Sequence, residues 1–240
     1  MTKLSVNINK VATIRNARGG SYPDVIEFAK KCYEYGADGI TIHPRPDQRH
    51  IRFEDVRILS EIFPKSDCEF NIEGYPSSEF IDMVLKYKPT QVTLVPDPPH
   101  VLTSDSGWNT EAHFDFLHPI IQQFQAIQIR VSLFMDTDLK LLDLAKKLEV
   151  ERIEFYTGEY AHHYITDKEK ALAPFIKAYH HCLQIGLDVN AGHDLSLQNL
   201  KYFKEHLPLC KEVSIGHHLI SDCLYFGLQN VIPMYKRLLR

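Results

Sequence analysis

Short apolar runs alternate with longer helical periods along the whole chain, and this alternation constrains the fold more than any other feature. Eight runs have the length and composition of buried strands, at residues 4–8, 39–43, 68–73, 91–95, 128–134, 152–156, 187–190 and 212–215. Helical patterns separate most of them, at residues 25–35, 77–87, 109–125, 141–148, 168–185, 196–206 and 217–239. Eight strands alternating with helices in 240 residues predict an α/β protein, a (β/α)8 TIM barrel with extra helices.

A doubly wound open sheet is the alternative fold. It finds less support, because no Gly-x-Gly-x-x-Gly follows the first expected strand, as a dinucleotide-binding fold of that kind would require. No low-complexity linker or tail of like charges interrupts the pattern. We therefore expect a single barrel domain over residues 1–240.

Charge and cysteine content narrow the class of protein. The net charge of −4 provides no global basic field, so we expect no nucleic-acid partner. The five cysteines are scattered and form no Cys-x-x-Cys pair, which is typical of reduced thiols in a cytosolic protein. The chain begins without the apolar core of a signal peptide, and no apolar run approaches membrane-spanning length. We expect a cytoplasmic protein with no membrane partner.

Titratable side chains stand where four of the expected strands end. His43 ends the second strand, Glu73 ends the third, Glu154 lies on the sixth, and His193 follows the seventh. A buried carboxylate or imidazole is costly without a partner, and the carboxyl ends of barrel strands meet in one place. The pattern predicts a shared acid/base site, although each group could instead be an independent structural hydrogen-bonding residue.

Two glycine-containing turns follow the last two expected strands. Gly192-His193-Asp194 and Gly216-His217 place glycine where the backbone approaches another group closely. Barrels commonly bind phosphate in this region, on backbone N–H groups and a helix N-terminus. The turns therefore favour a phosphate site, unless the glycines serve only to make tight turns.

Basic side chains after the first two strands predict further anion binding. Arg15 and Arg18 belong to an expected loop after the first strand, and Arg45 and His50 to the loop after the second. Arginine holds phosphate in a fixed fork geometry. Arg49 is more typical of an ordinary solvated loop charge. Two phosphate-directed regions would suit a pair of small phosphorylated substrates.

Histidine pairs elsewhere do not form a metal motif. His162-His163 falls in an expected loop and His180-His181 on an expected helix, and neither pair has a partner at ligand spacing. We therefore expect no metal. A metal-dependent barrel hydrolase or isomerase remains an alternative, with His43, Glu73, Glu154 and His193 as the ligands.

Taken in order, the strand-end motifs resemble the pyridoxine 5'-phosphate synthase (PdxJ) family, the ring-closing enzymes of vitamin B6 biosynthesis. The similarity covers essentially the whole chain and is anchored at residues 6–9, 12–18, 36–43, 45, 49–51, 71–73, 93–96, 131–134, 153–154, 157–158, 160–161, 190–193 and 214–217. It implies a (β/α)8 barrel with extra helices that assembles as a homo-octamer. It also implies condensation of 1-deoxy-D-xylulose 5-phosphate with 3-amino-2-oxopropyl phosphate to pyridoxine 5'-phosphate, phosphate and water, without a metal or organic cofactor.

The resemblance also implies roles for individual residues. His43 and Glu73 would be acid/base groups, His193 a proton donor, and Glu154 a stabiliser of the charged transition state. The deoxyxylulose phosphate would bind to Arg45, His50 and Thr103. The amino-ketone phosphate would bind to Asn7, Arg18, Asp194, Gly216 and His217.

Two departures from the family pattern bear on binding. Many members have Asp-His where this chain has Asn9-Lys10, and many have glycine where it has Asp194. Asp194 can still serve through its backbone N–H, but a carboxylate facing phosphate would be repulsive. A catalytically idle binder of phosphorylated ligands therefore stays an alternative. The loop over residues 97–109 is expected to close over the site, unless it is a plain surface loop.

Overall fold

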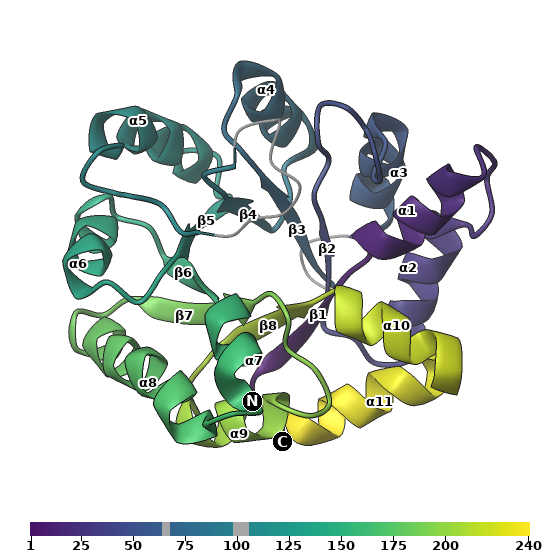
Figure 1. Ribbon diagram of the computed structural model, residues 1–240. Helices are drawn as coiled ribbons and strands as arrows, with labels where there is room; N and C mark the ends of the chain where they lie inside the picture. The colour runs from purple at the N-terminus through teal and green to yellow at the C-terminus, as the bar shows by residue number, and fades with distance from the viewer. Residues whose placement is uncertain (64–67, 98–105) are drawn as a thin grey trace.

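Eight parallel strands close into a barrel in the computed structural model, which describes residues 1–63, 68–97 and 106–240 (Figure 1). Each strand pairs with the next along the chain, and the first pairs with the last. Their bounds are β1 Lys3–Asn7, β2 Gly39–Ile42, β3 Glu69–Gly74, β4 Gln91–Leu94, β5 Arg130–Met135, β6 Arg152–Tyr156, β7 Asp188–Gly192 and β8 Glu212–Ile215. The barrel prediction is confirmed, and the open doubly wound sheet is wrong.

Helices surround the barrel as an outer ring in Figure 1. The described helices are α1 Asn9–Ala17, α2 Val25–Glu34, α3 Phe53–Ile62, α4 Ser78–Tyr87, α5 Phe114–Gln125, α6 Leu139–Lys147, α7 Gly158–Tyr164, α8 Lys168–Gln184, α9 Leu200–His206, α10 His217–Phe226 and α11 Leu228–Leu238. Several begin at side-chain caps, including Asp24 before α2 and Ser77 before α4, whose oxygens accept hydrogen bonds from the first-turn N–H groups.

Sequence periodicity missed three of these helices and joined two others. Helix α1 buries only three side chains and α7 has seven residues, so neither carries a long apolar stripe. Helix α3 was also missed. The segment expected to be one helix over 217–239 breaks at Gly227, whose φ of +76° lies in the left-handed region that glycine adopts readily.

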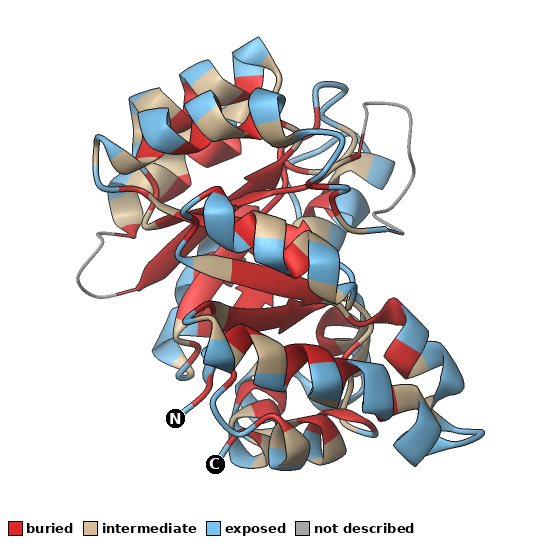
Figure 2. Cartoon of the chain, turned by 90° about the vertical axis from the view of Figure 1, so that its left-hand side faces the viewer, coloured by how far each residue is buried: buried red, intermediate tan, exposed pale blue. Residues whose placement is uncertain are grey.

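Apolar and polar side chains alternate along the strands and face opposite sides of the barrel wall. Phe70 and Ile72 of β3 belong to the hydrophobic core. The intervening Asn71 donates a hydrogen bond to Thr41 and accepts one from Thr93, on the two neighbouring strands. Figure 2 shows the strands buried beneath helices whose outer surfaces are exposed. The apolar core thus lies between barrel and helices, and the barrel interior is lined by polar groups.

Charged groups fill the N-terminal end of the barrel. The buried carboxylate of Glu69 pairs with Lys3 at 3.0 Å, with Arg152 at 3.3 Å and with Arg130. This end is therefore occupied by a structural ion cluster, and the opposite end is free to hold a site.

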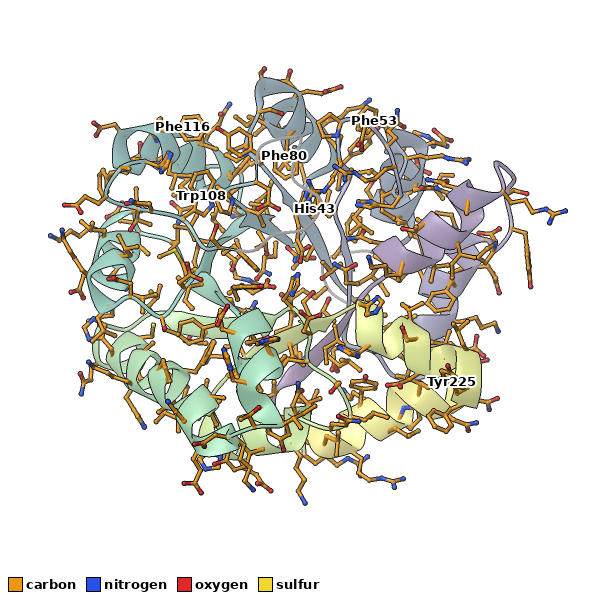
Figure 3. The ribbon with its side chains drawn as sticks, viewed as in Figure 1. His43, Phe53, Phe80, Trp108, Phe116 and Tyr225 are labelled. Carbon is orange, nitrogen blue, oxygen red and sulfur yellow. The ribbon has the colours of Figure 1, made fainter. Side chains whose placement is uncertain are left out.

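The last helix packs against α2, α9 and α10. Val231, Ile232 and Tyr235 of α11 are buried, and Lys236 pairs with Asp38. Tyr225, at the end of α10, is 82% exposed and lies at the rim of the ring in Figure 3. In the described part of the chain, no helix has the length and apolar composition needed to cross a membrane.

Candidate active site

A cavity of about 440 Å³ opens where the carboxyl ends of the strands meet. Figure 3 shows His43 toward the centre of the ring of strands. Every strand provides at least one lining residue, from within the strand or from the position just after it, including Asn7, His43, Glu73, Val95, Phe134, Glu154, His193 and Ser214. The closed barrel thereby brings all four acid/base candidates to a single cavity.

His43 follows β2 directly and is almost fully buried, with 8% of its surface exposed. Its backbone N–H donates to Asn9 Oδ1 at 2.9 Å, which ties the end of β2 to the start of α1. Burial holds the pKa of the imidazole well below its usual range, and the nearby Arg45 cation adds to this. His43 is therefore neutral at pH 7 and able to accept a proton.

Two buried carboxyl groups face the same cavity. Burial raises the pKa of Glu73 to about 8, and the carboxylates of Glu212 and Asp97 add to the effect. Burial, followed by the charge of Glu73, raises the pKa of Glu154 well above its usual value. Within the described residues, Glu154 Oε2 has no hydrogen-bond partner. Both groups favour the protonated form, and such a form can donate a proton near neutral pH.

Glycine at positions 192 and 216 allows the strand ends to pack closely against their neighbours. A Cβ at Gly192 would collide with Glu154 Oε1 and stand 3.1 Å from its Cδ. A Cβ at Gly216 would stand 3.2 Å from the Cβ and the carbonyl oxygen of Asn7. Gly216 is also the N-cap of α10, and His217 is its first residue, so the N-terminus of a helix lies at the cavity wall.

The segment after β2 lines another part of the cavity with Arg45, Arg49 and His50. His50 Nδ1 accepts a hydrogen bond from Ile51 N–H at 2.9 Å. Burial, aided by Arg45, lowers the pKa of His50 to about 4. The ring is consequently neutral at pH 7 with its proton on Nε2, and it offers a hydrogen-bond donor instead of a positive charge.

Arg45 is the buried cation of this segment. Its Nη2 donates to Asp97 Oδ2 at 3.1 Å, and both side chains are almost inaccessible to solvent. Burial lowers the pKa of Arg45 from its usual value. Arg49 pairs with Asp47 and keeps 31% of its side chain exposed, as expected of a loop charge, and it also lines the cavity.

Arg15 was expected in a phosphate-binding loop, and that expectation is wrong. It lies in α1, where its guanidinium donates to both oxygens of the Asp55 carboxylate at 2.7 and 2.8 Å and to the carbonyl of His50 at 3.0 Å. Both side chains of this pair are buried. Arg15 therefore supports the His50 segment from behind instead of facing the cavity.

The remaining candidates divide into three groups. Asn7, Asp194, Gly216 and His217 line the cavity. Arg18 is exposed at the end of α1 and is not among the lining residues. Thr103, together with most of the expected lid over residues 97–109, lies outside the described residues.

Sequence reasoning missed several lining residues. Thr13 faces the cavity from α1, which periodicity had assigned to a loop, and Ser214 and Phe134 lie on β8 and β5. Alternation along the strands was the available signal for the last two, because each lies an even number of positions from another inward-facing residue. Lys10, already noted as a departure from the family pattern that bears on binding, lines the cavity as well.

The histidine pair at 162–163 lies in α7 and not in a loop, which corrects that expectation. Among residues 1–63, 68–97 and 106–240, no group of three or more His, Cys, Asp or Glu side chains is arranged to hold a metal ion. The alternative of a metal-dependent barrel enzyme with His43, Glu73, Glu154 and His193 as ligands therefore finds no support in this geometry.

Known proteins resemble the chain over its full length. The model of the family described as "Pyridoxal phosphate biosynthesis protein PdxJ" matches residues 4–240. The pyridoxine 5'-phosphate synthase of Parabacteroides distasonis is 56% identical over 236 residues, which cover 98% of each chain. That of Bacteroides fragilis is 55% identical over 240 residues and the whole of both chains.

Solved structures with little sequence similarity share the fold. Tryptophan synthase from M. tuberculosis matches with a TM-score of 0.65 at 10% identity, covering 100% of this chain and 94% of the other. Phosphoribosyl anthranilate isomerase from Thermotoga maritima matches with a TM-score of 0.60 at 13% identity, covering 100% and 98%. At such low identity these likenesses support the barrel architecture alone.

Proposed function

The chain belongs to the PdxJ family of pyridoxal phosphate biosynthesis proteins, and on that premise we propose how its cavity performs the activity of a pyridoxine 5'-phosphate synthase. The observation that carries the proposal is the convergence of His43, Glu73, Glu154 and His193 on one cavity that is also lined by cations. The reaction condenses 1-deoxy-D-xylulose 5-phosphate with 3-amino-2-oxopropyl phosphate and releases pyridoxine 5'-phosphate, inorganic phosphate and water. It uses neither a metal nor an organic cofactor.

The deoxyxylulose phosphate binds against the segment after β2. Arg45 supplies a buried cation, and neutral His50 supplies an Nε2–H donor. Lys10 and Arg49 add positive charge at the same cavity wall, which supports phosphate binding there. Thr103 is assigned to this substrate on the family resemblance alone.

The amino-ketone phosphate binds at the part of the wall where α10 begins, beyond β1 from the segment after β2. The N–H groups after Gly216 and the His217 ring face this part of the cavity, and a helix N-terminus favours a negatively charged group. The backbone N–H of Asp194 and the Asn7 amide complete this site. Arg18 is assigned to it by resemblance, although the described cavity does not extend to that residue.

Proton transfer is divided between a proton acceptor and proton donors. Neutral His43 takes a proton from the attacking amine and passes it to the carbonyl oxygen, and protonated Glu73 donates the second proton with which this oxygen leaves as water. His193 donates in a later step that expels a hydroxyl group as water. Glu154 lies deep in the cavity and stabilises the cationic intermediates when it ionises.

We also propose a cytoplasmic, homo-oligomeric enzyme, assembled as an octamer, with one barrel domain in each subunit. Exposed apolar side chains support contact between subunits, in particular Tyr22, Leu224 and Tyr225.

A direct assay tests the proposed reaction. The purified chain, treated with a chelator, is supplied with both phosphorylated substrates, and pyridoxine 5'-phosphate and inorganic phosphate are quantified. Product should form with the chelator present, and His43→Ala should abolish it while the fold, followed by circular dichroism, is kept. Ligand binding without turnover would identify the idle binder, and turnover that requires an added metal would identify the metal-dependent alternative.

A further inference from the structure

His193 and its neighbour Asp194 form a hydrogen-bonded pair at the cavity wall. His193 Nδ1 lies 2.8 Å from Asp194 Oδ2, and the two side chains are 28% and 37% exposed. This hydrogen bond holds the pKa of Asp194 below its usual value, so the carboxyl group is ionised. Asp194 therefore accepts, and His193 Nδ1–H donates. In the described part of the chain, no hydrogen bond engages the other ring nitrogen, Nε2.

The backbone at this pair adopts an unusual conformation. His193 has φ +80° and Asp194 has φ +58°, so two consecutive residues other than glycine lie in the left-handed region. Such a conformation costs on the order of 1 kcal/mol or more per residue. Thr157 Oγ1 donates to the carbonyl of His193 at 2.5 Å, and Asn199 Nδ2 donates to that of Asp194 at 3.1 Å. Neighbouring side chains thus hold the turn in place.

The plane of the imidazole is also restrained. The Tyr156 ring lies edge-on to the His193 ring, with centroids 4.9 Å apart and an interplanar angle of 73°. With Nδ1 bonded to Asp194 and the ring packed against Tyr156, rotation of the imidazole would break one contact or the other. The geometry leaves Nε2 as the ring atom available to a substrate.

We propose that Asp194 is a positioning residue that fixes the tautomer and orientation of His193 for proton donation. This inference rests on the proposed function and deepens it, because His193 is there the proton donor. In the donating step the Nε2–H bond breaks, the proton passes to the leaving oxygen, and water departs. The neutral ring that remains carries its proton on Nδ1, where the Asp194 carboxylate accepts it.

The pair also explains how a carboxylate at position 194 can lie beside a phosphate site without repelling the phosphate. The Asp194 side chain is turned to His193 instead of standing free in the cavity, so its charge is used where it stabilises an imidazolium. The backbone N–H of residue 194 is unaffected by this arrangement. Family members with glycine at the position keep that N–H without the carboxylate, so we expect Asp194 to increase the rate without being essential.

The test compares Asp194→Gly with Asp194→Asn. Glycine keeps the backbone N–H, accepts the positive φ and removes the acceptor, so kcat should fall roughly tenfold, the value of one charge-assisted hydrogen bond. KM for each substrate should stay within about twofold, because substrate binding uses the backbone. The Asn variant keeps a carbonyl acceptor and should recover part of the lost rate.

A second His–Asp pair provides the matched control. His181 Nε2 lies 2.7 Å from Asp143 Oδ1 between α8 and α6, outside the cavity, so Asp143→Asn should leave kcat unchanged. Imidazole 15N spectra, with the His193 signals assigned from their loss in His193→Gln, should show the Nδ1–H tautomer in the parent. The Gly variant should show a mixture of tautomers.

Three outcomes separate the hypotheses. An active parent whose Gly variant keeps both its kcat and its tautomer overturns the role of Asp194 and leaves the proposed function intact. A rise in KM for the amino ketone alone, with kcat unchanged, also overturns it, because Asp194 would then serve only in binding. A parent without synthase activity overturns the proposed function, and the 15N spectra still decide whether the His193–Asp194 pair exists.

Discussion

Gly192→Ala is the substitution that most directly tests whether Glu154 takes part in the reaction. The added methyl group would collide with Glu154 Oε1, stand 3.1 Å from Cδ and lie 3.3 Å from the carbonyl oxygen of Ser214. Gly192 has no positive φ, so alanine fits the backbone. The substitution therefore acts by displacing the buried carboxyl group and not by straining the turn.

The size of the effect follows from that displacement. Ordinary contact between a methyl group and an oxygen requires the carboxyl group to move by about 1 Å or more, and a misplacement of that size can cost roughly a hundredfold in rate. A hundredfold loss corresponds to about 2.7 kcal/mol of transition-state stabilisation. Overpacking by one methyl group should cost about 1–3 kcal/mol of the free energy of unfolding, which most domains tolerate.

Steady-state kinetics of pyridoxine 5'-phosphate formation, with urea unfolding on the same samples, measures both quantities. Gly39→Ala is the packing control, because its Cβ would stand 2.9 Å from the carbonyl oxygen of Glu69 at the opposite end of the barrel. It should lower the unfolding free energy by a similar amount and leave kcat within about twofold, since nothing in the cavity moves. Glu154→Gln should lose about as much rate as Gly192→Ala.

The reasoning fails if folded Gly192→Ala protein turns over at the parent rate. Glu154 would then be a buried structural carboxyl group whose exact position is irrelevant to the reaction. Equal losses of kcat in the Gly192 and Gly39 variants would also refute it, because a general loosening of the barrel would explain both.

Three further predictions concern residues that line the cavity or support its wall. Arg45→Ala should raise KM for the deoxyxylulose phosphate at least tenfold and leave KM for the amino ketone nearly unchanged. An equal rise in both KM values would refute the assignment of Arg45 to the deoxyxylulose phosphate. Arg15→Lys should lower the free energy of unfolding by about 3 kcal/mol, because a single ammonium cannot bind both the Asp55 carboxylate and the His50 carbonyl. Urea titration measures this loss, and an unchanged midpoint would contradict the prediction. The raised pKa of Glu73 means that the folded chain binds more protons than the unfolded one between about pH 4.5 and 8, so stability falls as pH rises through that window. Glu73→Gln should flatten this decline in thermal unfolding between pH 5 and 8, and an unchanged slope would show that Glu73 does not titrate there.

Strand-ending polar residues were readable from the sequence because a barrel places all its strand termini at one end. His43, Glu73, Glu154 and His193 could be assigned to one site once eight alternating strands were recognised. Arginine positions were harder to interpret. Arg15 and Arg49 both looked like loop cations, and only packing distinguished the buried partner of Asp55 from the cavity residue.

The sequence by itself determined the barrel, its strand boundaries to within a few residues, and the family, because hydrophobic alternation and ordered motifs are local properties of the chain. Only the tertiary structure decided the protonation of the site and the partners of its groups. Burial makes His43 neutral and favours protonated Glu73, and a left-handed turn directs the Asp194 carboxylate to His193. These properties depend on desolvation and on distances between residues far apart in the chain or held in an unusual backbone conformation, which no local pattern encodes.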